Sequence, residues 1–362
     1  MSSSRGAAGS FLVFVGTFRR LGGAGIYATT FDTESMTFRE LGLAAEVIDP
    51  IYMALDSRNR RLFSVAAADE DSRSGLVIAY ELPSAGYELR EIAQWSTGGA
   101  AACHIDYSSS AAVVTTANYL GASVCAAAVD GEWLFNPAPQ WLAHRGASVH
   151  PQRQTRPHPH SITFDPEGKR AIACDLGTDQ LLEYEVSGEG HRPLCDRPNI
   201  VPCIPGSGPR HLVFHPCGRW LYVVNELSST VTAYHYSSAS GIGRPLGTWT
   251  TLPDDWEGLS LPAAIRTDLA GDKLFVSNRG HDSIVTFDID AASGTLQRGV
   301  FKRCGGRLPR DIAVTPDGRA LLVANEKTGS LVALPLDSAS GQPEAAAAEL
   351  AIPGAVAILF AG

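Results

Sequence analysis

The sequence lacks any hydrophobic run long enough to cross a membrane. The apolar run near its start, in "MSSSRGAAGSFLVFVGTF", is five residues long, whereas a membrane-spanning helix needs about 20 apolar residues and a signal-peptide core about 7–15. We therefore expect no membrane partner and read this run as a first β-strand. Apolar residues at helical spacing are also missing over any useful window, which argues against an α-helical protein.

The motifs of several common enzyme classes are absent too. No G-x-S-x-G elbow occurs, and the best-placed serine, Ser161, only follows a histidine into a strand-like run, so a serine-hydrolase triad is not expected. There is no G-x-x-x-x-G-K-[ST] loop and no G-x-G-x-x-G before a helix, which excludes the usual nucleotide-binding folds. No C-x-x-C or Cys/His cluster has zinc spacing. The sequence thus predicts neither a cofactor nor a metal.

The cysteines do not form a disulfide pattern. There are seven, an odd number, and they are scattered along the chain. We read them as reduced thiols of a cytoplasmic protein. A bridge between the nearest pair, Cys195 and Cys203 in a proline-rich loop, is the alternative.

Basic residues are outnumbered by acidic ones, and the formal net charge is -9. Such a chain is poorly suited to bind nucleic acid or an anionic membrane surface. An anionic small molecule remains a candidate partner, because a binding site responds to its local charges.

Glycine and proline, by contrast, are plentiful, with 36 and 22 residues, and they indicate many turns between short strands. Four similar segments recur: "HSITFDPEGKRAIACDLGTDQLLEYEV" from 160, "RHLVFHPCGRWLYVVNELSSTVTAYHY" from 210, "AAIRTDLAGDKLFVSNRGHDSIVTFDI" from 263 and "RDIAVTPDGRALLVANEKTGSLVALPL" from 310. Two weaker copies begin at 52 and 103. Each reads as strand, polar turn, strand, a short polar segment that we call the knot, and a third strand. The knots fall near Ala66, Asn118, Asp175, Asn225, Asn278 and Asn325.

A period of about fifty residues in an all-β chain is typical of propeller blades. The six copies leave strands at both ends, "SFLVFVGTF" and "GIYATTF" at the N-terminus and "AAELAIPGAVAILFAG" at the C-terminus. We predict an all-β, seven-bladed β-propeller whose ring is closed by a blade shared between N- and C-terminal strands, which hides the sheet edges. The whole chain, 1–362, is expected to be one domain, with residues 1–10 as a flexible tail. Two stacked sandwiches are the alternative.

The repeat predicts a ring of polar side chains at one mouth of the central channel. In a propeller the first strand of each blade is innermost, so the start of that strand and the knot lie at the same end of the channel. Three arginines, several imidazoles and two glutamates would meet there: His104, Asn118, Tyr119, His158, His160, Asp175, Arg210, His211, Asn225, Glu226, Arg279, His281, Arg310, Asn325 and Glu326. A cationic, concave mouth of this kind suits a phosphate or carboxylate ligand.

Purely structural roles are open for some of these residues. The knot residues Asn118, Asp175, Asn225, Asn278 and Asn325 can each cap a turn by bonding nearby backbone. Arg210 and Glu226 can form a structural ion pair, and His160 can be a buried structural histidine.

The chain resembles the lactonase seven-bladed propeller family, which includes bacterial cycloisomerase-2-type 6-phosphogluconolactonases and fungal carboxymuconate-lactonising enzymes. The segments that carry the resemblance are "CHI" with "ANYLGASV", "RPHPHSITFDPEG" with "DLGTDQL", "GPRHLVFHP" with "NELSSTV", "SNRGHDSI" and "LPRDIAVTPDGRALLVANE". The resemblance implies an active-site set that falls on His158 or His160, Arg210, Glu226 and Arg279. One departure is Ala264, which stands where the family usually has an acid.

We therefore expect a lactone hydrolase, with 6-phosphogluconolactone as its substrate. The predicted catalytic residues are His160, Glu226, Arg210 and Arg279: His160 or Glu226 takes a proton from water, and Arg210 or Arg279 offsets charge on the carbonyl oxygen. The residues expected to bind substrate are His104, Asn118, Tyr119, His158, His211, His281, Arg310 and Glu326. A muconate cycloisomerase and a non-enzymatic binding scaffold are the alternatives. We expect a monomer or weak homo-oligomer.

Overall fold

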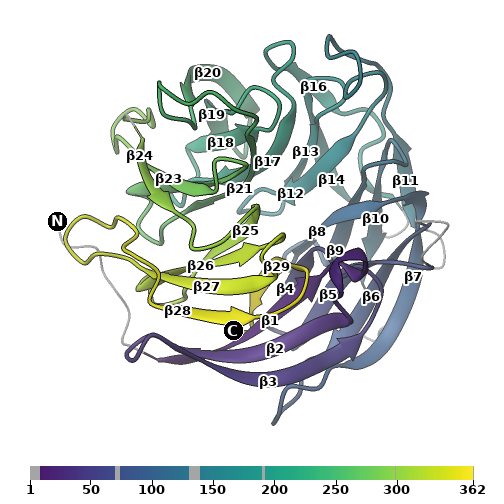
Figure 1. Cartoon of the computed structure of the whole chain (residues 1–362). Coiled ribbons are helices and arrows are strands. Elements are labelled where there is room, and N and C mark those ends of the chain that lie inside the picture. The colour runs from purple at the N-terminus through teal and green to yellow at the C-terminus, as the bar shows by residue number, and fades with distance from the viewer. Residues whose placement is uncertain (1–8, 70–73, 130–138, 190–191, 298, 362) are drawn as a thin grey trace.

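The computed structural model describes residues 9–69, 74–129, 139–189, 192–297 and 299–361. In these residues seven antiparallel sheets surround a central channel (Figure 1), which confirms the predicted β-propeller. The expected tail, residues 1–10, lies outside the described residues except for Gly9 and Ser10, and Ser10 already begins the first strand.

Three blades are built from the N-terminal part of the chain and its last strand. Blade 1 contains β1 (Ser10–Thr17), β2 (Gly25–Asp32), β3 (Thr37–Glu46) and β29 (Ala355–Phe360). Blade 2 contains β4 (Met53–Asp56), β5 (Arg61–Ala67), β6 (Ser74–Glu81) and β7 (Arg90–Ala100). Blade 3 contains β8 (Ala102–Ser108), β9 (Val113–Asn118), β10 (Ser123–Ala128) and β11 (Gln140–Ala143).

Four further blades follow in chain order. Blade 4 contains β12 (Pro159–Phe164), β13 (Arg170–Asp175), β14 (Gln180–Glu189), β15 (Arg192–Leu194) and β16 (Asn199–Pro202). Blade 5 contains β17 (Pro209–Phe214), β18 (Trp220–Asn225), β19 (Thr230–Ser237) and β20 (Gly241–Thr250). Blade 6 contains β21 (Leu261–Thr267), β22 (Lys273–Arg279), β23 (Ser283–Asp288) and β24 (Val300–Arg303). Blade 7 contains β25 (Pro309–Val314), β26 (Ala320–Asn325), β27 (Ser330–Pro335) and β28 (Ala348–Ala351).

The two ends of the chain close the ring in blade 1. Strand β29 pairs antiparallel with β1, with Val13 opposite Phe360 and Val15 opposite Ile358. The C-terminal strand thus supplies the inner edge of a sheet whose other three strands are N-terminal, which confirms the predicted shared blade. The first part of the C-terminal segment assigned to this blade forms β28 of blade 7 instead, and the N-terminal part supplies a third strand, β3. This pairing leaves no inner edge of β1 free to recruit another chain.

The second strand of a blade is its most buried element, because neighbouring blades cover both of its faces. Every residue of β18, "WLYVVN", and of β26, "ALLVAN", is buried. Such strands read as continuous apolar runs instead of alternating ones. Their apolar side chains pack between blades, and each run ends at a knot asparagine beside the channel mouth.

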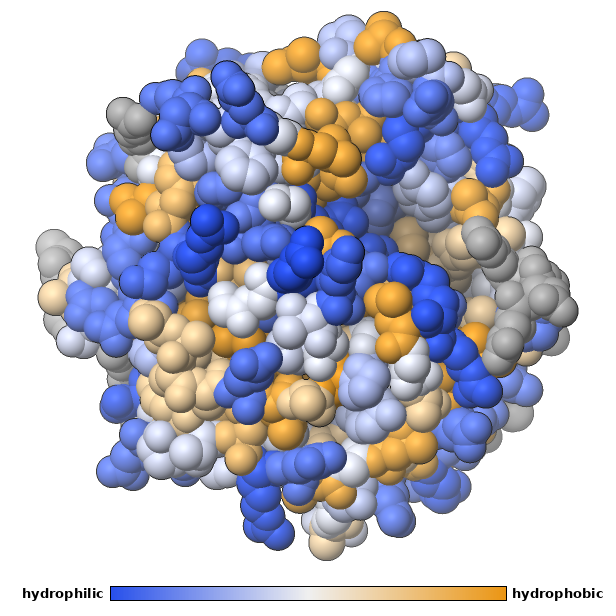
Figure 2. Space-filling view, in the orientation of Figure 1, coloured by the Kyte–Doolittle hydropathy of each residue, from blue (hydrophilic) through white to orange (hydrophobic). Residues whose placement is uncertain are grey.

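The connection from β1 to β2 holds the one helix among the described residues, the 3-10 helix η1 (Arg19–Leu21). The sequence did not predict it, since three residues carry no periodicity. Within the described part of the chain no helix is long and apolar enough to span a membrane. Hydrophilic residues surround a hollow near the middle of the face that carries η1 (Figure 2).

Candidate active site

A β-bulge at the start of the inner strands aims side chains at the channel mouth. On β12, Pro159 pairs with Asp175 and Ser161 with Cys174, so the residue between them has no partner opposite. That residue is His160. A bulge of this kind bends the strand and redirects the extra side chain. The same register shift leaves one extra residue in each of β8, β17 and β25: Cys103, Arg210 and Arg310.

The bulge of β21 is different, because it holds two alanines. Pro262 pairs with Asn278 and Ile265 with Val276, so Ala263 and Ala264 together lie opposite a single residue, Ser277. Ala264 is fully buried in an apolar cluster. In blade 6 the bulge therefore contributes no polar side chain, and the Arg210 guanidinium fills the gap by donating from Nη1 to the Ala263 carbonyl at 2.6 Å.

The knots supply the second set of side chains at this mouth. Tyr119, Glu226 and Glu326 directly follow the knot asparagines of blades 3, 5 and 7, and Arg279 follows Asn278 at the end of β22. Bulge and knot lie side by side in each hairpin because the strands are antiparallel. Blades 3, 5 and 7 therefore each deliver two side chains to this mouth, whereas blade 4 delivers His160 and blade 6 delivers Arg279.

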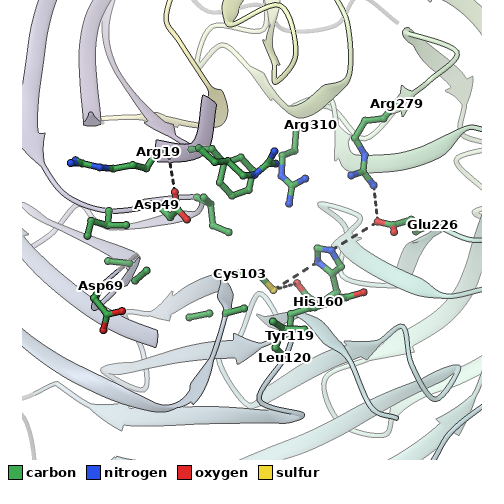
Figure 3. A pocket seen from close by; sticks show the side chains of 18 of the residues that line it. Arg19, Asp49, Asp69, Cys103, Tyr119, Leu120, His160, Glu226, Arg279 and Arg310 are labelled. Carbon is green, nitrogen blue, oxygen red and sulfur yellow. Dashed lines mark hydrogen bonds and ion pairs between the residues drawn. The ribbon is translucent and has the colours of Figure 1, made fainter. Parts of the chain in front are cut away.

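Together these residues surround a cavity of about 640 Å³ at the mouth. This size lies within the usual range for small-molecule sites. Its polar and ring-bearing lining residues, most of them shown in Figure 3, are Phe18, Arg19, Arg20, Asp49, Asp69, Cys103, Tyr119, Arg153, His160, Glu226, Arg279 and Arg310. Figure 3 shows His160 and Arg310 directed into the open space and Arg279 directed at Glu226.

Glu226 is the centre of the ionic network. Its Oε2 accepts from Arg279 Nη2 at 2.7 Å and from Arg210 Nε at 3.0 Å, and its Oε1 accepts from Arg153 Nη2 at 2.6 Å. The side chain is 3% exposed. Burial alone would raise the pKa of Glu226, but the charges around it, with Arg279 first, outweigh burial and hold the pKa below its usual range. Glu226 is thus a carboxylate that is poorly suited to take up a proton.

His160 has the opposite character. Its Nε2 lies 3.9 Å from Glu226 Oε2, and on its other side Cys103 Sγ lies 4.0 Å from Nδ1. The thiol donates to the His160 carbonyl at 3.3 Å, which fixes the backbone at the bulge. Burial and the charge of Arg210 hold the pKa of His160 well below its usual range. His160 is therefore neutral near pH 7 and able to accept a proton.

A second ionic group lies on the wall formed by blades 1 and 7. Glu326 accepts from Arg310 Nη1 at 3.1 Å and from Arg20 Nη2 at 2.5 Å. Both guanidinium groups lie over the Phe18 ring, with Cζ 4.3 Å (Arg20) and 4.9 Å (Arg310) from its centroid. Across both groups, five guanidinium groups share two carboxylates. The mouth therefore carries excess positive charge within an acidic protein.

Other residues expected at the site lie away from this cavity. The His104 and His211 rings lie deeper in the channel, with centroids 5.2 Å apart. His104 faces a second cavity, of about 530 Å³, at the ends of the inner strands. His281 contacts Trp256 and bonds Ser283 Oγ at 2.7 Å.

Asn118 and His158 support the site without lining the cavity. Asn118 Nδ2 donates to the Thr97 carbonyl of the preceding blade at 3.3 Å and to Ser123 Oγ at 3.1 Å. The His158 ring stacks on Tyr119 at 4.5 Å, and its Nδ1 lies 2.9 Å from the Tyr119 carbonyl oxygen. Both residues thus hold neighbouring parts of the mouth in place.

Arg153, Phe18 and Arg20 are among the lining residues that escaped the sequence analysis, because they lie outside the repeat. Arg153 comes from the loop between β11 and β12, and it also donates to Tyr119 Oη at 3.2 Å. Phe18 and Arg20 come from the β1–β2 connection at η1. Loops of this kind differ between blades, so no periodic signal marks them. Cys103 was noted only as a thiol, although it occupies the same bulge position as His160 and Arg210.

The fold and this site define a class of protein. The family model described as lactonase, 7-bladed beta-propeller, matches residues 12–360. The chain therefore belongs to the lactonase family of seven-bladed β-propellers.

Individual relatives agree with this membership over nearly the full chain. The 6-phosphogluconolactonase of Bacillus subtilis (strain 168) is 32% identical over 350 residues, covering 97% of this chain and 98% of its own. The protein of that name from Formosa agariphila is 28% identical and covers 94% of this chain and 97% of its own. The structure of the periplasmic gluconolactonase of Pseudomonas aeruginosa superposes with a TM-score of 0.90 at 30% identity, covering 97% and 99% of the two chains.

Proposed function

We propose that this protein hydrolyses a sugar lactone at the channel mouth and that the substrate is 6-phosphogluconolactone. The observation that carries the proposal is the contrast between neutral His160 and the triply paired carboxylate of Glu226, side by side in a cationic cavity. His160 can accept a proton, and the fixed negative charge of Glu226 stabilises the protonated histidine. The names of the Bacillus and Formosa relatives support the phosphorylated lactone, and they favour hydrolysis over a muconate cycloisomerase.

In the proposed reaction a water molecule attacks the lactone carbonyl carbon while His160 takes one of its protons. Arg279 stabilises the negative oxygen of the tetrahedral intermediate. The bond from this carbon to the ring oxygen then breaks, and the histidine returns the proton to the departing oxygen. The product is a hydroxy acid, which ionises and releases one proton to solvent.

The arginines around Glu226 hold its carboxylate in place beside His160. The Arg210 side chain is 2% exposed and bonds both Glu226 and the Ala263 carbonyl, so we assign it a positioning role. Arg279 Nε donates to the Leu261 carbonyl at 3.0 Å, which holds its guanidinium group beside Glu226. Arg153 donates to the other carboxylate oxygen, Oε1. Of the four residues expected to be catalytic, we therefore propose His160 and Arg279 to act on the substrate.

The proposed partner is an anionic lactone, and we place the protein in the cytoplasm as a monomer or weak homo-oligomer. All seven cysteines are free thiols, and Cys195 and Cys217 are exposed. Exposed free thiols are typical of a reducing compartment. One relative, the Pseudomonas gluconolactonase, is described as periplasmic, so fractionation of the source cells is the direct test of location.

Proton release after addition of freshly prepared 6-phosphogluconolactone tests the activity. The wild type should release protons much faster than buffer alone, and His160→Gln should lower kcat by about 10²–10⁴-fold, the usual contribution of a positioned general base. His235→Gln is the matched control, since this half-buried histidine lies on β19, away from the channel. A wild-type rate equal to that of buffer would rule out the activity. Equal rates for wild type and His160→Gln would rule out His160 as the general base.

A further inference from the structure

The wall formed by Phe18, Arg20, Arg310 and Glu326 is not needed for the chemical step proposed above. It lies where η1 of blade 1 meets blade 7. The Phe18 amide donates to the Gly354 carbonyl at 2.9 Å, and the Phe18 carbonyl accepts from Gly23 at 3.0 Å. The pairing that closes the ring, next to Gly354, therefore also fixes Phe18. Its ring is a rigid platform for the two guanidinium groups above it.

The two guanidinium groups retain the capacity to bind an anion. Each has five N–H donors in a fork that matches phosphate oxygens. The bonds to Glu326 use Nη1 of Arg310 and Nη2 of Arg20. Burial and the nearby charge of Arg279 lower the pKa of Arg310. An anion at this wall would offset that repulsion between cations.

The guanidinium groups of Arg210 and Arg279 are less suited to bind a phosphate. Arg210 and Arg279 are bonded to Glu226 and to main-chain carbonyls. The Arg20 side chain, by contrast, is 58% exposed, so a doubly charged group beside it keeps part of its hydration. The same wall also bears the negative charge of Asp49, whose Oδ1 accepts from the Arg19 amide at 2.8 Å. A phosphate bound there therefore needs both arginines.

We propose that Arg20 and Arg310, held over Phe18 by Glu326, form the subsite for the phosphate group of the lactone, and that Arg20 determines the preference for phosphorylated over unphosphorylated substrate. The inference rests on the proposed function, because it assigns one end of the same cavity. The lactone carbonyl then lies toward His160 and Arg279, and the phosphate lies toward the seam between blades 1 and 7.

Kinetics with two substrates tests the subsite. We expect Arg20→Gln to lower the ratio of kcat/KM for 6-phosphogluconolactone to kcat/KM for glucono-δ-lactone by about 10–100-fold, through KM, because a charge-assisted bond to the phosphate is lost. Arg20→Lys keeps the charge and should recover part of the ratio. Arg90→Gln is the matched control: this exposed arginine pairs with Glu81 and lies on β7, the outer strand of blade 2, outside the cavity, so the ratio should not change.

The outcomes separate this inference from the proposed function. If Arg20→Gln lowers kcat/KM for both lactones by the same factor, or leaves the ratio unchanged, the phosphate subsite is wrong although the lactonase activity stands. If the wild type hydrolyses neither lactone, calorimetry with the products still tests the subsite. Wild type should then bind 6-phosphogluconate at least tenfold more tightly than gluconate, and Arg20→Gln should remove this difference. Equal affinities of the wild type for the two acids would overturn the inference.

Discussion

A histidine can act as a general base only in its neutral form, and burial provides that form at His160. Burial and the Arg210 charge lower its pKa, and the Glu226 carboxylate opposes them only in part. His160 is thus in its neutral, proton-accepting form at pH 7. The carboxylate stabilises the imidazolium that forms after proton transfer, without competing for the proton.

The pH profile of kcat/KM follows from this. The neutral fraction of His160 falls only when the pH drops through its pKa, which lies well below 6.5. We therefore expect kcat/KM to stay level from pH 7.5 down through 6.5 and to decline only at more acidic pH. Initial rates of lactone consumption, corrected for the spontaneous opening in the same buffer, give the profile. A decline centred at or above pH 6.5 would contradict a buried, neutral base.

Site residues could be predicted from the sequence where they occupy a position of the repeat, and not where they belong to a loop. Arg210, Glu226 and Arg279 occupy fixed positions of the repeat, so their convergence could be predicted from the blade pattern. The same pattern treats Arg210 and His211 alike, yet the bulge directs Arg210 toward Glu226 at the mouth and leaves His211 deeper in the channel. Arg153 and Arg20 belong to loops without a repeat, so only three-dimensional structure brings them to the site.

At the scale of the element, the knots and the bulges have separate tasks. The bulge residues Cys103, His160 and Arg310 line the cavity. The knot asparagines of blades 3 and 6 instead bond the neighbouring blade. Asn118 Nδ2 donates to the Thr97 carbonyl at the end of blade 2, and Asn278 Nδ2 donates to the Thr251 carbonyl after blade 5 at 2.6 Å. Both asparagines are fully buried. Their arrangement favours the capping role that the sequence left open for them.

Replacing Asn118 by alanine should therefore affect stability and not substrate binding. We expect the free energy of unfolding to fall by about 1 kcal/mol, the net contribution of a typical hydrogen bond, while KM for the lactone stays the same. Denaturant unfolding and initial-rate kinetics on the same preparation measure the two effects. Asn278→Ala, which removes the equivalent contact between blades 5 and 6, should behave alike. A raised KM with unchanged stability would instead support the expectation that Asn118 binds substrate.

At the scale of the whole molecule, ring closure and the binding site are connected. The strand that completes blade 1 comes from the C-terminus, and the turn before it holds Phe18 through Gly354. Blade number and ring closure could be predicted from the sequence because each blade repeats one apolar pattern. The shape of the cavity could not, since it depends on η1 and on the loop that carries Arg153.

The central claim is that distant blades assemble one site, in which the reacting carbonyl faces His160 and Arg279 and the phosphate faces Arg20 and Arg310. A crystal structure of the wild type with 6-phosphogluconate tests it most directly. We expect the carboxylate of this product within hydrogen-bonding distance of Arg279 and His160, and its phosphate on Arg20 and Arg310. Product bound instead in the cavity at the other end of the channel, beside Arg266 and Asp311, would contradict the account.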